Sequence, residues 1–86
     1  MVRKKKSLEE VIKILETVVK GLVDYEDKIE IKIIKKDPFI VEILCDDQDR
    51  GSIIGRQGTT IITLREIFTK ISLRHLGEKP TIIVRD

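Results

Sequence analysis

The sequence predicts an α+β fold, a two-layer α/β sandwich in which a three-stranded sheet is covered by helices on one face. Three observations predict it. An early segment repeats apolar residues with the helical period of 3.6, two later segments alternate with a period of two, and a glycine-rich stretch with helical pattern on both sides precedes a last β-like run. The predicted order of elements is helix, strand, strand, short helix, helix, strand.

Length and composition limit the chain to one small domain. A chain of 86 residues buries only roughly 60 to 65% of the surface that it exposes when unfolded, which is enough for one core. Isoleucine, leucine and valine supply most of the 41% hydrophobic residues. No segment is apolar over the roughly 20 residues that span a bilayer, and the N-terminus lacks the apolar region of a signal peptide. We therefore predict a cytoplasmic protein without a membrane segment.

Charge and cysteine content predict no cofactor and no metal. The lone cysteine, Cys45, has no partner for an internal disulfide or a metal-binding pair. The net charge is only +2, but "RKKK" at residues 3–6 concentrates positive charge near the N-terminus. We predict a basic flexible tail over residues 1–7 and a domain over residues 8–86. A terminal run of this kind is more often a solvated end than a phosphate contact, and both interpretations stay open.

The first helix is predicted to begin after Ser7. Ser7 and Glu10 have the spacing of a capping box, in which each side chain accepts a hydrogen bond from the other residue's backbone N–H. Gly21 is predicted to weaken or end the helix, and the polar segment 24–28 to form a turn. The helix must cover an apolar surface, because apolar residues recur with helical spacing at Leu8, Val11, Ile12, Leu15, Val18, Val19 and Leu22.

Two strands are predicted to follow as an antiparallel hairpin. Ile29, Ile31 and Ile33 alternate with charged residues, which is typical of a strand buried on one face. The segment "KKDP" at residues 35–38 supplies the turn. A second alternating segment then places on one face Phe39, Val41, Ile43 and Cys45. A last strand is predicted at Thr81–Asp86, after the breaker "GEKP".

Two helices are predicted between the hairpin and the last strand. Asp46 or Asp47 is a candidate cap for a short helix that reaches residue 54. Thr59 or Thr60 is a candidate cap for a longer helix, with its stop predicted at Gly77.

The link between these helices, "GRQG" at residues 55–58, carries the clearest functional signal. Gly55 fits a left-handed conformation that ends the first helix, and Gly58 lets the chain turn directly into the next. So tight a link pushes Arg56 outward, beside the free N–H groups and the positive dipole end of the following helix. That combination attracts anions, especially phosphate. The spacing of the glycines fits neither a Walker A loop nor a dinucleotide-binding fingerprint.

The nine residues "IIGRQGTTI" at 53–61 resemble the core signature of KH domains: apolar, Ile, Gly, x, x, Gly, x, x, Ile, with one x basic. The predicted order α-β-β-α-α-β is that of type II, prokaryotic KH domains, and the resemblance covers about 80 of the 86 residues. The chain is similar to the small bacterial RNA-binding KH proteins of the KhpA (YlqC) family. Further matching stretches are "GLVDYEDK" at 21–28 and "DRGSIIGRQG" at 49–58.

The resemblance implies where RNA binds. In KH domains the Gly-x-x-Gly loop clamps the backbone of about four single-stranded nucleotides, and the bases lie along an adjacent apolar groove. Val41 or Ile43 is expected on the far wall of that groove. The candidate RNA-binding residues are the clamp Gly55, Arg56, Gln57 and Gly58, the groove floor Ile53, Ile54 and Ile61, and the flanking Arg50, Thr59 and Thr60.

The resemblance also implies a biological role. It implies a non-catalytic protein that binds single-stranded RNA as an RNA chaperone or post-transcriptional regulator, as a homodimer or with a larger KH-domain protein. The sequence departs from the family in the helix after the loop, which carries threonines and Phe68 where a more alanine-rich, basic stretch is expected. This departure affects the surface charge and any dimer contact rather than the loop.

An alternative function is a KH-fold module that docks a partner protein. Ile40, Leu44 and Ile83 are predicted on the sheet face opposite the main alternation and would form the docking patch. An enzyme is not predicted, because no acid, base and nucleophile converge, and His75 and Cys45 have more ordinary explanations as a helix-end residue and a buried apolar residue.

Overall fold

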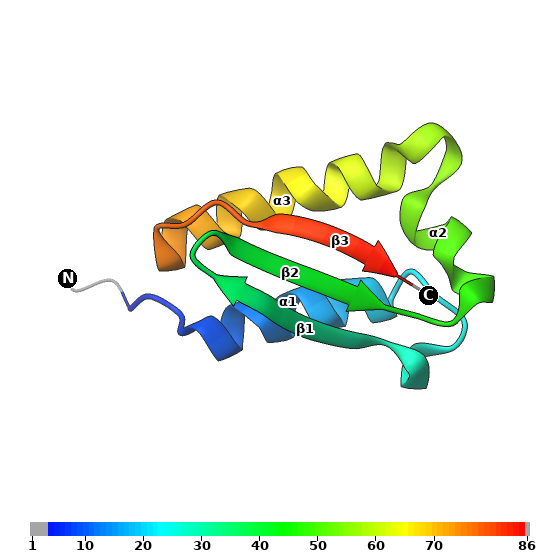
Figure 1. The fold of residues 1–86 in the computed structure, drawn as a ribbon, viewed down its shortest axis with the longest axis horizontal. Helices are drawn as coiled ribbons and strands as arrows, with labels where there is room; N and C mark the ends of the chain where they lie inside the picture. Colours follow the sequence, from blue (N-terminus) through cyan, green and yellow to red (C-terminus); the bar gives the residue numbers. More distant parts are fainter. Residues whose placement is uncertain (1–3, 86) are drawn as a thin grey trace.

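The computed structural model describes residues 4–85 and confirms the α+β fold (Figure 1). Residues 1–3 of the predicted tail and Asp86 of the predicted last strand lie outside the described residues. The elements, in chain order, are α1 (Leu8–Lys20), the 3₁₀ helix η1 (Glu26–Lys28), β1 (Glu30–Lys36), β2 (Phe39–Leu44), η2 (Asp47–Asp49), α2 (Arg50–Ile54), η3 (Arg56–Gly58), α3 (Thr59–Leu76) and β3 (Thr81–Arg85).

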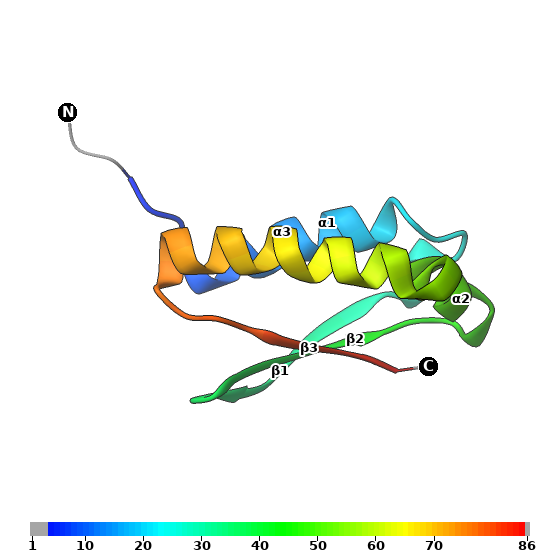
Figure 2. The ribbon, with the colours of Figure 1, turned by 90° about the horizontal axis from the view of Figure 1, so that it is seen from above.

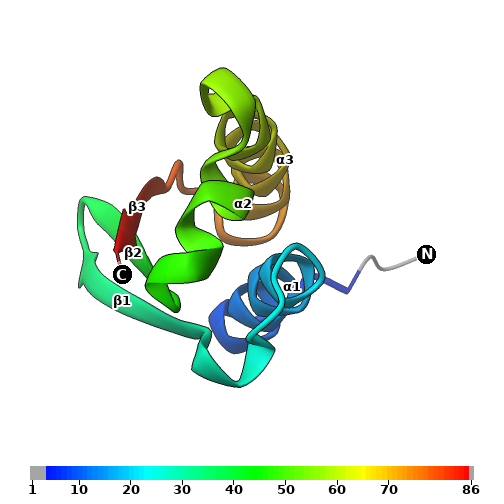
Figure 3. The ribbon, with the colours of Figure 1, turned by 90° about the vertical axis from the view of Figure 1, so that its right-hand side faces the viewer.

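The three strands form one mixed sheet with β2 in the centre. Strand β1 pairs antiparallel with β2, which confirms the hairpin, and β3 pairs parallel with β2 so that Ile82 lies opposite Val41. Parallel strands need a long crossover, and α2 and α3 provide it. Helices α1 and α3 lie on the same face of the sheet, which makes two layers (Figure 2). Figure 3 views the molecule from the end that carries α2.

Helix α1 begins as the sequence predicts. The Ser7 side chain accepts a hydrogen bond from the Glu10 backbone N–H, at 3.2 Å, and the Glu10 carboxylate accepts one from the Ser7 N–H, at 3.1 Å. The hydrogen bond from the Ser7 backbone N–H lowers the pKa of the Glu10 carboxyl, and the Ser7 side chain, Lys6 and Lys4 add smaller contributions. Gly21 ends the helix, but in a right-handed rather than a left-handed conformation.

The core lies between the sheet and the helices, and the alternating residues of the two predicted strands fill it as expected. The buried apolar residues are Val11, Leu15, Val19, Ile29, Phe39, Val41, Ile43, Cys45, Ile53, Ile61, Leu64, Phe68 and Ile82. One expectation is wrong: Val18, predicted on the covered stripe of α1, is 44% exposed. Its side chain lies at the α3 edge of that stripe, where the neighbouring helix does not close over it.

The acidic run before α2 has two distinct roles. The Asp46 side chain accepts a hydrogen bond from the Gln48 N–H, at 2.9 Å, and so caps η2 rather than the helix that reaches residue 54, because α2 begins after Asp49 without a side-chain cap. Asp49 is instead buried, and its two carboxylate oxygens accept bonds from the backbone N–H groups of Asp24 and Tyr25, at 3.0 and 2.9 Å. Asp49 therefore fixes the loop after α1 to the start of α2, a few residues before the link at 55–58.

This anchor generates a stability prediction. Asp49→Ala leaves two partly buried N–H groups without an acceptor, so we expect the free energy of unfolding to fall by about 2 to 3 kcal/mol in urea titrations. Asp49→Asn keeps one acceptor oxygen and should lose less. The control Asp47→Ala, at an exposed neighbour, should change the value by less than about 0.5 kcal/mol. Equal effects of Asp49→Ala and Asp47→Ala would contradict the assigned role.

Candidate nucleic-acid interface

The chain reverses between α2 and α3 within four residues, and three of these have a positive φ. Gly55 lies at φ 79° and ψ 169°, Gln57 at φ 55° and ψ 27°, and Gly58 at φ 76° and ψ 11°. Gly55 therefore has the positive φ expected, but in an extended region that only glycine adopts readily rather than in the left-handed helical region. The reversal leaves Arg56 and Gln57 exposed at the tip.

The two glycines of the loop are needed for different reasons. A Cβ at Gly55 would lie 2.7 Å from the backbone nitrogen of Thr60 and 2.6 Å from its Cβ, which excludes any larger residue. A Cβ at Gly58 would meet nothing within 4 Å. Gly55 is thus required by contacts inside the protein, whereas at Gly58 glycine is favoured by the left-handed backbone alone and the surface above it is open.

The start of α3 has no side-chain cap. The predicted caps Thr59 and Thr60 are wrong, because Gly58 is the N-cap residue and makes no side-chain bond. The Thr59 hydroxyl instead donates to the Arg56 carbonyl, at 2.8 Å, and so braces the loop. No acidic residue lies in the first turn. The Gly58 and Thr59 N–H groups donate to the Gly55 and Arg56 carbonyls, but no side chain opposes the positive end of the helix dipole, which therefore stays available to an anion.

The predicted groove floor is mostly core. Ile53 is 0% and Ile61 is 5% exposed, and the predicted far wall, Val41 and Ile43, is also fully buried. These four side chains have no surface to offer to a base, so that part of the expectation is corrected. They belong instead to the hydrophobic core. Of the three predicted floor residues only Ile54 is partly exposed.

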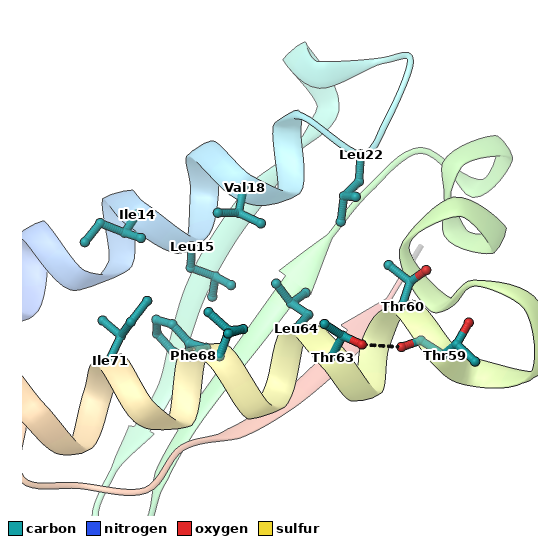
Figure 4. A pocket seen from close by; sticks show the side chains of 11 residues that line it. Ile14, Leu15, Val18, Leu22, Thr59, Thr60, Thr63, Leu64, Phe68 and Ile71 are labelled. Atoms are coloured by element: carbon teal, nitrogen blue, oxygen red, sulfur yellow. Dashed lines mark hydrogen bonds between the residues drawn. The ribbon is translucent and has the colours of Figure 1, made fainter.

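A different apolar groove opens beside the loop, between α1 and α3 (Figure 4). Its volume is about 340 Å³. Side chains of both helices point into it, and Thr59 and Thr60 lie at its loop end (Figure 4). The sequence indicates this groove through apolar residues of α1 and α3 that lie outside the buried stripes. Among them are Val18 and Ile67, which are 44% and 51% exposed.

Comparison with known proteins agrees with this geometry. The family model "KhpA/KhpB, KH domain" matches residues 12–84. The chain belongs to the KhpA/KhpB KH-domain family. Its type II KH fold follows from this match together with the observed element order. The matched residues include the loop and the groove and exclude the basic residues before Ser7.

Three similar proteins carry the name "RNA-binding protein KhpA". The protein of Aquifex aeolicus is 36% identical over 67 residues, covering 77% of this chain and 84% of the relative. That of Borreliella burgdorferi is 35% identical over 57 residues, covering 65% and 70%. That of Leifsonia xyli subsp. xyli is 35% identical over 57 residues, covering 64% and 74%. No solved structure is significantly similar to the chain.

The sheet face proposed for protein docking is less apolar in this KhpA-family structure than the sequence indicates. Ile40, Leu44 and Ile83 are only partly exposed. Glu42, paired with Ile83 across the sheet, makes an ion pair with Arg85, which itself lies opposite Leu44. This ion pair places charge within the apolar patch, and the patch is therefore less suited to docking a partner protein.

The residues considered for other chemistry have structural partners. Cys45 is buried, and its thiol donates to the Arg85 carbonyl, with 3.4 Å between sulfur and oxygen. The Nδ1 atom of His75 accepts a hydrogen bond from the Lys6 backbone N–H, at 2.9 Å. Within residues 4–85 no three His, Cys, Asp or Glu side chains gather as metal ligands, and no helix of this part is long and apolar enough to cross a membrane.

Because Gly55 and Gly58 are constrained differently, replacing each with alanine should lower the free energy of unfolding by a different amount. Gly58→Ala should lower the free energy of unfolding by about 1 to 2 kcal/mol, the cost of a left-handed alanine in open space. Gly55→Ala adds a clash with Thr60 and should cost at least about 2 kcal/mol more. Chemical denaturation of both variants measures the difference. Equal costs would mean that Thr60 does not constrain Gly55.

Proposed function

We propose that this chain is a non-catalytic protein that binds single-stranded RNA by gripping the sugar-phosphate backbone with the loop of residues 55–58. The observation that carries the proposal is the open surface at Gly58, next to an uncapped helix start and two exposed polar side chains. The names of the KhpA relatives, all RNA-binding proteins, support RNA as the ligand.

Each loop residue contributes a different interaction with the strand. The missing Cβ at Gly58 lets a phosphate approach the backbone, where the positive end of the α3 dipole favours negative charge. The Arg56 guanidinium adds charge-assisted hydrogen bonds, and the Gln57 amide adds a neutral donor. Gly55 and Thr60 act from inside, because they fix the reversal that holds these groups together.

The flanking candidates keep smaller roles. Arg50 is exposed at the start of α2, one short helix away from the loop, and adds positive charge to the approach. Ile54 offers a partly exposed apolar contact, and Thr59 braces the Arg56 carbonyl. Ile53 and Ile61 are proposed only as the buried support under the loop.

A single loop of this size binds weakly. If roughly three phosphates are neutralised, the logarithm of the binding constant falls with a slope of about −2 against the logarithm of salt concentration. Pairing of two such domains raises the affinity through effective concentration. We therefore propose that the chain acts as a homodimer or with a larger KH-domain protein, in the cytoplasm, as an RNA chaperone or post-transcriptional regulator.

The loop variant Arg56→Asp/Gln57→Asp tests this function directly. It keeps both glycines, and aspartate is one of the few residues that tolerate the left-handed conformation of Gln57. We expect at least about a tenfold loss of affinity for a labelled degenerate single-stranded RNA in fluorescence anisotropy, since two phosphate contacts become repulsive. The salt slope should also approach zero.

The matched control is Lys35→Asp/Lys36→Asp, at exposed positions of β1. It lowers the net charge by four, one more than the loop variant does, but away from the loop, and it should alter binding by less than about threefold. Unchanged binding by a folded Arg56→Asp/Gln57→Asp variant would refute the loop as the grip.

A further inference from the structure

A hollow lined by hydrogen-bond donors lies at the end of α3 that is far from the loop. Lys4, Lys5, Arg74 and His75 line it, and its volume is about 200 Å³. Helix α3 has 18 residues, so about 27 Å separate its two ends. Figure 1 shows the N-terminal segment and the C-terminal end of α3 at one end of the molecule and the α2–α3 link at the other. The hollow is therefore separate from the loop of residues 55–58.

Two hydrogen bonds hold the segments that form the hollow. The Lys6 backbone N–H donates to His75 Nδ1, at 2.9 Å, and attaches the basic N-terminal segment to α3. The hydroxyl of Ser72, which is fully buried, donates to the Glu78 carbonyl, at 2.6 Å, and holds the chain where it leaves α3. The basic segment and the end of α3 are therefore kept together, although the residues that join them are 69 positions apart in the chain.

All four side chains that line the hollow are donors. The ammonium groups of lysine and the guanidinium group of arginine have no acceptor atom. Because Nδ1 of His75 accepts a hydrogen bond, the neutral ring carries its proton on Nε2, which is then a donor. Lys4, Lys5 and Arg74 are cations at neutral pH, and among residues 4–85 the ion pairs include none of them. These side chains therefore offer a ligand several donors and no free acceptor.

One carboxylate lies near the hollow without neutralising it. The Ser7 N–H, and to a smaller extent Lys6 and Lys4, lower the pKa of the Glu10 carboxyl. This carboxylate accepts the Ser7 N–H, at 3.1 Å, and within residues 4–85 it forms no ion pair with either lysine. The positive charge of the hollow therefore has no partner in the described part of the chain.

The helix dipole explains only half of this cluster. Cations are favoured at the negative end of a helix, which accounts for Arg74 and His75 in the last turn of α3. Lys4 and Lys5 come from a different segment, and the dipole of α3 does not determine their place in the sequence. Cations that gather from two segments around one hollow indicate an anionic ligand.

A terminal phosphate group suits the hollow better than the phosphodiester of a strand interior. A phosphate monoester carries about −1.5 to −2 charges at pH 7 and presents three acceptor oxygens, whereas each phosphodiester carries a single charge. The Coulomb energy between a cation and the ligand rises in proportion to the charge of the ligand. Three cations and an imidazole N–H therefore favour the terminal group.

We propose that Lys4, Lys5, Arg74 and His75 form a binding site for a terminal phosphate group, carried either by the 5′ end of an RNA or by free phosphate. The three cations compensate the charge of the phosphate, and His75 Nε2 donates to one of its oxygens. The inference goes beyond the proposed function, because the site needs neither the loop nor a strand held by the loop.

The test starts from the variant Arg56→Asp/Gln57→Asp, so that its result does not depend on the loop. Two RNA tetranucleotides labelled at the 3′ end, one with a 5′-phosphate and one with a 5′-hydroxyl, are compared by fluorescence anisotropy at low salt. We expect the phosphorylated RNA to bind at least about fivefold more tightly, since its additional dianion meets three cations. Adding Lys4→Ala/Lys5→Ala/Arg74→Ala should abolish this preference.

The matched control adds Lys28→Ala/Lys35→Ala/Lys36→Ala to the same loop variant. It removes as many exposed positive charges elsewhere and should leave the preference for the 5′-phosphate unchanged. A preference that survives the loss of Lys4, Lys5 and Arg74, or that both triple variants reduce equally, overturns the site.

Inorganic phosphate identifies the source of the ligand. It is added to the ¹⁵N-labelled loop variant at constant ionic strength, and free phosphate as a ligand should move the N–H signals of Lys5, Lys6 and His75 along a saturable curve. A preference for the 5′-phosphate without these shifts assigns the site to RNA ends, and saturable shifts without the preference assign it to free phosphate. Equal binding of the two tetranucleotides, or binding of neither, without saturable shifts overturns the inference.

Discussion

The structure depends on the close contact between Gly55 and Thr60, which lets α2 end and α3 begin within four residues. Because there is no room for a longer connection, the chain leaves α2 in a conformation that only glycine adopts readily and turns twice more through left-handed backbone. The same reversal sends α3 back across the sheet, so that β3 can pair parallel with β2. It also leaves the start of α3 without a cap. The reversal that closes the fold is thus also the feature on which the proposed phosphate contact depends.

In the loop region, one set of residues supports the loop from the core and another set faces the solvent. Ile53 and Ile61, on either side of the loop in the chain, are buried in the core, while Arg56 and Gln57 are exposed at the tip of the loop. This division fits the proposed grip in a chain with only 3% aromatic residues, because the grip is on the backbone of the strand rather than on stacked bases. It also lets surface residues of the loop change without disturbing the core.

Local patterns in the sequence predicted most of the fold. The Ser7–Glu10 capping box, the alternation on both strands and the stop at Gly77 each depend on residues a few positions apart, so the sequence displays them directly. The errors concern contacts between distant segments. Asp49 binds backbone groups 24 and 25 residues away. Val18 is exposed because α3 does not cover it, whereas Ile53 and Ile61 of the predicted groove floor are buried in the core. Hydrophobic periodicity predicts none of these contacts, because it identifies an apolar face of a helix or strand but not the segment that packs against it.

The central claim is that the backbone of residues 56–59 touches the strand. Proton–nitrogen correlation spectra recorded while an unlabelled RNA tetranucleotide is added to the ¹⁵N-labelled protein test it most directly, because they report on every backbone N–H separately. The account predicts that the largest shift changes fall on the N–H groups of Arg56, Gln57, Gly58 and Thr59, and that they fade as salt is raised. Changes centred instead on the outer sheet face around Ile40 and Ile83, with the loop signals unmoved, would contradict it.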